Sequence, residues 1–167
     1  MAPGGSDQVQ ATHLVLSCID HRCTDDLVSV IPDIIDDRKN AWDRYDLIAL
    51  PGASMGVMQT ERPSWGEAFW DQVAVALSLH TRITTVVVVD HLQCGAYRHF
   101  HPGYEANMEE AHRAVTADFA AAVRARHPAL RVERWLLEPV PGSDLNWEAR
   151  CLGTERRAER VVRCKVR

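Results

Sequence analysis

The sequence lacks any apolar run that approaches the roughly 20 residues needed to cross a bilayer, so we expect no membrane partner. Its start, residues 1–7, has neither the basic stretch nor the apolar centre of a secretory signal, which makes the cytoplasm the expected location. Internal repeats and low-complexity segments are absent as well. A composition of 46% hydrophobic and 25% charged residues over 167 residues is typical of one globular domain with a real core.

An excess of basic residues is also missing, since the formal net charge is −4. This gives no reason to expect nucleic acid as a partner. The charge is unevenly spread, because residues 150–167 hold seven Arg or Lys and two Glu, a local charge of +5 that leaves −9 for the rest. We interpret this basic tail as a solvated or partner-docking segment.

The five cysteines are an odd number in a chain expected to be intracellular, which argues against a disulfide framework. Metal binding or catalysis is the better explanation for some of them. Cys23, Cys151 and Cys164 have no patterned partner, and we interpret them as ordinary thiols. Cys18 and Cys94 differ, because each belongs to a motif that directly follows an apolar run.

Short apolar or β-branched runs alternate with stretches of helical spacing. The expected strands are 13–18, 45–50, 83–89 and 130–137. The continuous β-branched run 83–89 predicts a central strand that is buried on both faces. One expected helix begins at Thr24 and has Pro32 inside its apolar pattern. Two more helices are expected at 64–79 and 107–126.

In the expected helix 64–79, Ser64 and Glu67 have the spacing of a capping box. Its apolar residues Trp65, Phe69 and Trp70 fit a core face or part of a subunit interface. A core face is the interpretation that we favour.

Strands that alternate with helices predict a three-layer α/β fold with a mainly parallel central sheet of about four strands. In the order 2-1-3-4 the first and third strands are neighbours, and their carboxyl ends form a switch point where ligands bind. We expect this fold to occupy residues 11–140, after a flexible N-terminus at 1–10 and before a basic C-terminal extension at 141–167.

Cys18, His91 and Cys94 fall at this expected switch point. Cys18 ends the first strand, and His91 and Cys94 follow the third. Thiolate and imidazole are ligands that Zn²⁺ prefers, and two Cys with one His form a known catalytic set that leaves a fourth position for water or substrate. Because topology and ligand chemistry agree, we predict a zinc site.

The motifs around these residues are Cys18-Ile19-Asp20-His21-Arg22 and His91-Leu92-Gln93-Cys94-Gly95. They resemble the Cys-x-Asp-x-Arg and His-x-x-Cys-Gly pair of the β-class carbonic anhydrases. The resemblance, which covers about residues 14–97, implies that Cys18, His91 and Cys94 hold zinc and that Asp20 and Arg22 form a catalytic dyad. Asp20 could accept a hydrogen bond at the open site or fill the fourth position, and a bidentate contact from Arg22 would favour the open state.

Two segments depart from the pattern of that family. Leu50-Pro51-Gly52-Ala53-Ser54 stands where the family has an Arg-Asn-Ala-Gly-like segment, and Asp90 stands where it usually has glycine. A carboxylate at position 90 could be a hydrogen-bond partner near the metal ligands or could simply end the strand.

The activity that the resemblance implies is the reversible hydration of carbon dioxide to bicarbonate and a proton, a lyase reaction in which hydroxide on zinc is the nucleophile. The family also implies a homodimer or higher homo-oligomer. His21, His80 and His99 are candidate proton shuttles by residue type alone. For each of them, an ordinary surface or core histidine is the interpretation that we favour.

Three alternatives follow from the same residues. The first is a hydrolase of carbonyl sulfide or carbon disulfide on this scaffold, since both are small linear heterocumulenes. The second is a non-catalytic zinc protein in which Asp20 permanently fills the fourth position. The third, a cysteine phosphatase, needs a Cys-x₅-Arg motif, and the spacings from Cys18 to Arg22 and from Cys94 to Arg98 argue strongly against it.

Overall fold

A six-stranded sheet runs through the centre of the molecule in the order β2-β1-β3-β4-β5-β6. The computed structural model describes residues 10–143, 146–153 and 161–163. β2, β1, β3 and β4 pair in parallel, whereas β5 and β6 continue the sheet in antiparallel fashion. The strands are β1 His13–Ser17, β2 Tyr45–Ala49, β3 Thr85–His91, β4 Arg131–Pro139, β5 Trp147–Gly153 and β6 Val161–Arg163.

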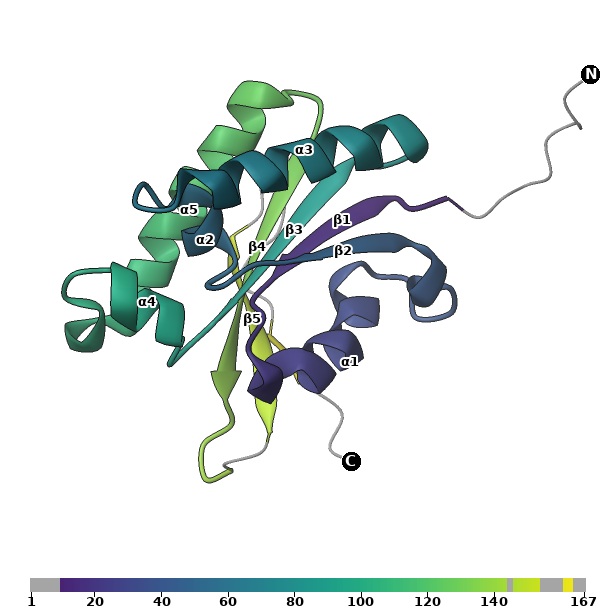
Figure 1. Cartoon of the computed structure of the whole chain (residues 1–167). Coiled ribbons are helices and arrows are strands. Elements are labelled where there is room, and N and C mark those ends of the chain that lie inside the picture. Colours follow the sequence, from purple (N-terminus) through teal and green to yellow (C-terminus); the bar gives the residue numbers. More distant parts are fainter. Residues whose placement is uncertain (1–9, 144–145, 154–160, 164–167) are drawn as a thin grey trace, which may run out of the picture.

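Helices cover both faces of the sheet and complete a three-layer α/β fold (Figure 1). One face carries α2, α3 and α5, and the other carries α1. The helices are α1 Thr24–Ile34, α2 Ser54–Met58, α3 Pro63–Leu79, α4 Gly95–Phe100 and α5 Met108–Arg126, with 3₁₀ turns at His21–Cys23, Ala41–Asp43 and Tyr104–Ala106.

Successive residues of the central strands face opposite sides of the sheet, and both sides are apolar. Leu14 and Leu16 of β1 pack with Phe69 of α3 and Phe119 of α5. Val15, between the two leucines, instead belongs to the cluster formed with α1. All seven residues of β3 are buried, which confirms the prediction of a central strand from its β-branched run.

The predicted order 2-1-3-4 is confirmed, but the predicted number of about four strands is wrong. β5 lies beyond the boundary expected at residue 140 and pairs with β4. Its pattern is a short alternation in which Trp147, Ala149 and Cys151 are buried between partly exposed polar residues. Nearby prolines and charged residues obscured this alternation in the sequence. Residues 154–160 and 164–167 of the basic tail lie outside the described part of the chain, as do residues 1–9 of the N-terminus expected to be flexible.

The bounds of the third strand and the cap of α3 also differ from the predictions. β3 begins at Thr85 and runs through His91, because the Ile83 N–H closes a turn onto the carbonyl of His80 instead of joining the strand. The capping box at Ser64 does not form, since α3 begins at Pro63 with Arg62 as its N-cap residue. Proline suits the first helical position because its ring fixes φ there, and the N–H that it lacks would have no partner within the helix.

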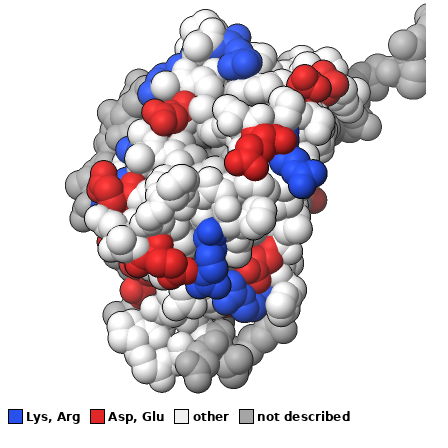
Figure 2. All heavy atoms as spheres, turned by 60° about the vertical axis from the view of Figure 1, so that its left-hand side comes forward, with Lys and Arg blue, Asp and Glu red and all other residues white. Residues whose placement is uncertain are grey.

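Both signs of charge are interspersed on the side of the molecule that carries α4 and α5 (Figure 2). Such a surface has no single-sign field on that side to attract a polyanion. Within the described residues, no helix combines the length and the apolar character that crossing a membrane requires.

Candidate metal centre

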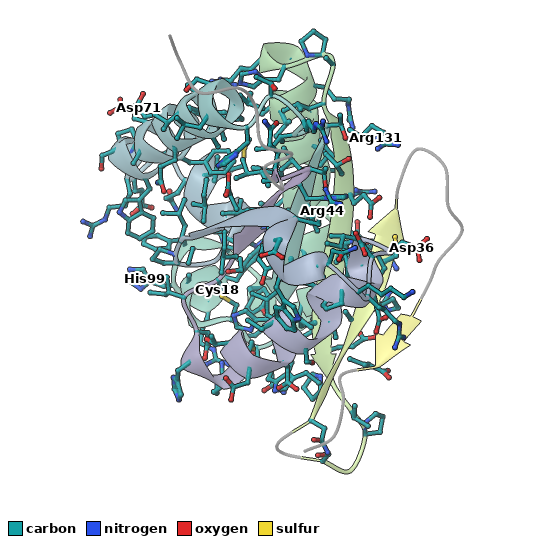
Figure 3. All side chains as sticks on the ribbon, turned by 90° about the vertical axis from the view of Figure 1, so that its right-hand side faces the viewer. Cys18, Asp36, Arg44, Asp71, His99 and Arg131 are labelled. Carbon is teal, nitrogen blue, oxygen red and sulfur yellow. The ribbon has the colours of Figure 1, made fainter. Side chains whose placement is uncertain are left out.

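The carboxyl ends of β1 and β3 bring Cys18, His91 and Cys94 together. Ser17 and Val89 are register partners in the two strands, so Cys18 emerges beside the end of β3. The ligand atoms of the three residues all lie within 4.8 Å of one another, and the two Sγ atoms are 3.9 Å apart. In Figure 3, Cys18 lies toward the opposite end of the strands from Arg131, the first residue of β4.

The His91 ring is prepared for a ligand on one nitrogen. Its Nδ1 atom lies 2.9 Å from the carbonyl oxygen of Leu92, to which it donates. Its Nε2 atom is buried and has no hydrogen-bond partner. A buried polar atom without a partner is costly unless another group engages it. The ring of Trp147 packs edge-on against His91 at a centroid distance of 6.0 Å and holds its plane.

These donors fit a zinc ion. Two sulfurs at about 2.3 Å from a tetrahedral zinc would be about 3.8 Å apart, and the Cys18 and Cys94 sulfurs are 3.9 Å apart. The free Nε2 atom of His91 supplies a third donor of a type that zinc prefers.

Electrostatic coupling within the trio favours a negative charge on sulfur. The hydrogen bond from the Cys94 thiol lowers the pKa of Cys18 to about 4, although burial acts to raise it. The same contact raises the pKa of Cys94. Burial of the His91 ring lowers its pKa, but the Cys18 and Cys23 thiols beside it more than offset this and raise it to about 10. A dication placed among these groups would compensate the thiolate charge and release protons.

Asp20 and Arg22 stand at the edge of this trio. Arg22 holds both carboxylate oxygens of Asp20, with Nε donating to Oδ1 at 3.0 Å and Nη2 donating to Oδ2 at 2.7 Å. The same Nη2 donates to the carbonyl of Gln93 at 3.1 Å, which ties the pair to the loop before Cys94. The Arg22 hydrogen bonds lower the pKa of Asp20 to about 2. Oδ2 of Asp20 is 3.8 Å from Nε2 of His91.

The three candidate shuttle histidines lie in different places. The His21 side chain is 94% exposed and its Nδ1 atom is 3.8 Å from Asp20. His99 is exposed on α4 and points outward at the edge of the molecule in Figure 3. His80 pairs with Asp46 near the amino end of β2, away from the carboxyl ends of the strands. Only His21 therefore contacts the candidate centre.

The remaining cysteines have different surroundings. Cys23 is buried in the turn after Asp20, and its thiol is one of the two that raise the pKa of His91. Cys151 is buried in β5 among the residues that pack against α1. Cys164 lies outside the described residues.

A backbone donor to Cys18 is present that could not be predicted from the sequence. The Gly52 N–H points at the Cys18 sulfur at an N–S distance of 3.3 Å. Gly52 has φ +77°, and Ala53 after it has φ +45°. The Pro51-Gly52 turn that departs from the family pattern thus supplies a hydrogen bond to a candidate ligand. The turn itself was visible in the sequence, but its target depends on the packing of β2 beside β1.

Gly52→Ala is expected to destabilise the fold by about 1–3 kcal/mol, because a side chain with positive φ is strained. The added Cβ would also lie 3.0 Å from Cβ of Ala96. Gly95→Ala is the matched control, since a Cβ there meets nothing within 4 Å. Urea unfolding of both variants measures the difference, and equal midpoints would contradict the expectation.

Comparisons with known proteins leave the function to be argued from this centre. No protein-family model matches the sequence. An uncharacterized protein of Rickettsia conorii is 27% identical over 132 residues, which cover 77% of this chain and 68% of that protein. An uncharacterized protein of Rickettsia bellii is 25% identical over 132 residues, covering 77% of each. Among solved structures, a tetrameric β-carbonic anhydrase of the ascomycete Sordaria macrospora matches with a TM-score of 0.39 and 12% identity, over 77% of this chain and 76% of that one.

Proposed function

We propose that this protein is a zinc-dependent enzyme that catalyses the reversible hydration of carbon dioxide, in which carbon dioxide and water give bicarbonate and a proton. The single observation that carries the proposal is the grouping of Cys18, His91 and Cys94 within 4.8 Å, with an arginine-held carboxylate at its edge. The sequence resemblance around the same residues supports the assignment of these ligands.

Three protein ligands distinguish a catalytic zinc site from a closed structural one. Structural zinc sites usually have four protein ligands, whereas catalytic sites use three and keep one position for water or substrate. Among the described residues, the only group of His, Cys and carboxylate side chains that could hold a metal contains three members. When bound there, zinc would lower the pKa of a coordinated water toward neutrality and so supply a nucleophile.

Asp20 is the residue that would manage the proton of that nucleophile. Its Oδ2 atom, 3.8 Å from Nε2 of His91, lies close enough to the trio to accept a hydrogen bond from a group held there. The pKa of Asp20, lowered to about 2 by Arg22, keeps the carboxylate an acceptor at neutral pH. A fixed acceptor orients the attacking oxygen toward the carbon of the substrate.

Arg22 would keep Asp20 from becoming the fourth ligand. Both oxygens of Asp20 are engaged by the guanidinium, and the guanidinium is anchored on the Gln93 carbonyl. Moving Asp20 onto the metal would break this bidentate contact, which is among the stronger kinds of hydrogen bond. The contact thus favours a catalytic site over the non-catalytic alternative in which Asp20 closes it.

The decisive experiment is stopped-flow hydration of carbon dioxide by purified protein of measured zinc content, at neutral and alkaline pH. Carbonyl sulfide and carbon disulfide are tested in parallel, and protein depleted of zinc and then reconstituted serves as the control. Fast hydration that follows zinc occupancy supports the proposal. Zinc binding without hydration contradicts it, in favour of the other heterocumulenes if they are hydrolysed and of a non-catalytic zinc protein if they are not.

The same resemblance leads us to propose a homodimer or higher homo-oligomer. Multi-angle light scattering on the full chain measures the assembly directly. A monomer at all accessible concentrations would contradict this part of the proposal without affecting the chemistry of the metal centre.

A further inference from the structure

A buried polar network lies directly behind the candidate metal centre. Asp90, the residue before His91, is 1% exposed, and Ser54 and His112 are fully buried around it. Its Oδ1 accepts from the Ser54 N–H at 3.1 Å. Its Oδ2 accepts from the Ser54 hydroxyl at 2.7 Å, the Tyr97 hydroxyl at 2.5 Å and Nδ1 of His112 at 3.0 Å. Burial of so many polar groups is costly unless every one has a partner.

The network continues from Asp90 to the backbone of Cys94. Nε2 of His112 lies 3.1 Å from the Tyr104 hydroxyl. The Cys94 N–H donates to that hydroxyl oxygen at 3.1 Å. One arrangement of protons satisfies each group on this path, because His112 can donate from Nδ1 to Asp90 and accept the Tyr104 proton at Nε2. The direction of each hydrogen bond is then fixed from Cys94 back to Asp90.

The network contacts the backbone segments that carry the candidate ligands or donate hydrogen bonds to them. Asp90 adjoins His91, and Tyr104 fixes the backbone of Cys94. Ser54 follows the Gly52-Ala53 turn, whose Gly52 N–H reaches the Cys18 sulfur. The network therefore joins the segments around all three members of the trio, although it contains none of their side chains.

The backbone at these segments needs such support. Ala53 and Gln93, the residues before Ser54 and before Cys94, have positive φ of 45° and 59°. Such conformations cost about 1–3 kcal/mol each for residues other than glycine and persist where the surrounding structure enforces them. The Ser54 N–H bond to Asp90 and the Cys94 N–H bond to Tyr104 follow directly after the two strained residues.

We propose that the Asp90–His112–Tyr104 network is the positioning device of the metal centre, and that Tyr104 sets the place of the Cys94 thiolate through the Cys94 N–H. The inference rests on the metal centre of the proposed function. It assigns the network a role beyond stability, because a displaced Cys94 sulfur changes the affinity and ligand geometry of the metal. Partners of this kind commonly affect metal affinity by about 10–100-fold.

The network also explains why the chain has Asp90 where related motifs have glycine. Tyr97, Tyr104 and His112 pack against one another as rings, with centroid distances of 3.9 Å for Tyr97 with His112 and 5.5 Å for Tyr104 with His112. Burial, together with the charge of Asp90, raises the pKa of Tyr97 well above its usual value, so its phenol remains a donor. A glycine at position 90 would remove the carboxylate that accepts from the Tyr97 hydroxyl and from Nδ1 of His112.

Tyr104→Phe tests the inference, with Tyr45→Phe on β2 as the matched control. Zinc affinity is measured by competition with a chromogenic chelator, and ligand geometry by the thiolate charge-transfer and d–d absorption bands of the Co²⁺-substituted protein. We expect Tyr104→Phe to weaken zinc binding by about 10–100-fold and to change the Co²⁺ spectrum, while Tyr45→Phe changes neither. A purely structural role would lower the unfolding midpoint and leave affinity and spectrum unchanged, and that result would overturn the inference.

Two further results separate this inference from the proposed activity. If Tyr104→Phe does not fold, Ser54→Ala replaces it, since this change removes the hydroxyl bond to Asp90 and keeps the backbone N–H. Unchanged zinc affinity in Ser54→Ala would then overturn the inference. A wild-type protein that binds zinc without hydrating carbon dioxide, and that loses affinity in Tyr104→Phe, would support the network and contradict only the activity. A wild-type protein that binds no zinc would overturn both.

Discussion

Replacing Cys94 by serine is expected to remove most of the bound zinc. Cys94 is 1% exposed. Its sulfur lies 3.9 Å from the Cys18 sulfur, so both sulfurs can bind one ion. A serine hydroxyl is neutral at physiological pH and is a poor replacement for thiolate on zinc. Only two of the three donors would then remain. Metal analysis of the protein after gel filtration measures the loss.

Cys151→Ser is the control for this result. It makes the same change at another buried cysteine, in β5, whose surroundings are the apolar cluster against α1. We expect this variant to keep its zinc, although the buried hydroxyl lowers its stability. Stoichiometric zinc in Cys94→Ser would show that the ligand set is different, and zinc loss in both variants would point to a general effect on folding.

The sequence predicts those members of the metal centre whose positions follow from the ends of the strands. Cys18 follows β1 and His91 ends β3, and any fold with these strands side by side and parallel brings the two residues together. The prediction required the apolar runs of two segments, the common strand order 2-1-3-4, and the chemistry of thiolate and imidazole. The structure places the three donor atoms within 4.8 Å, as that order implies.

The network behind the centre could not be predicted in the same way. His112 lies on α5 and Tyr104 in a 3₁₀ turn, and neither stands in a motif with Asp90. The alanine-rich composition of residues 107–126 predicts the helix that contains His112, but the rotation that turns His112 toward β3 depends on packing. From the sequence alone, Asp90 fits either a hydrogen-bond partner near the metal ligands or the end of a strand. The structure shows it inside β3, buried and bonded to Ser54, Tyr97 and His112.

Trp147 illustrates a second limit. Its ring packs against His91, yet it comes from β5, in a region where no strand or helix could be predicted from the residues. An antiparallel strand added at the side of a parallel sheet is specified by pairing with its neighbour more than by its own residues. The register of β5 with β4, which places Trp147 opposite Pro139, is a property of the pair.

Replacing Asp20 by alanine is expected to leave zinc in place and to lower kcat/KM for carbon dioxide hydration by about 10²–10⁴-fold, the usual contribution of a positioned proton acceptor. The carboxylate does not belong to the three-donor group, so the metal would keep its protein ligands. Removing it also leaves the Arg22 guanidinium, which donates twice to Asp20, without its anionic partner beside the centre. Stopped-flow kinetics and metal analysis on the same sample separate the two effects.

Asp71→Ala is the control for Asp20→Ala, since Asp71 is an exposed carboxylate on α3, far from Cys18 in Figure 3. We expect it to match the wild type in both measurements. An Asp20→Ala variant with full activity would contradict the role given to the dyad. Loss of zinc would have a different meaning, because it would show that Asp20 ligates the ion in solution despite its contact with Arg22. The geometry argues for the first expectation, since Arg22 holds both oxygens of Asp20 and is itself fixed on the carbonyl of Gln93.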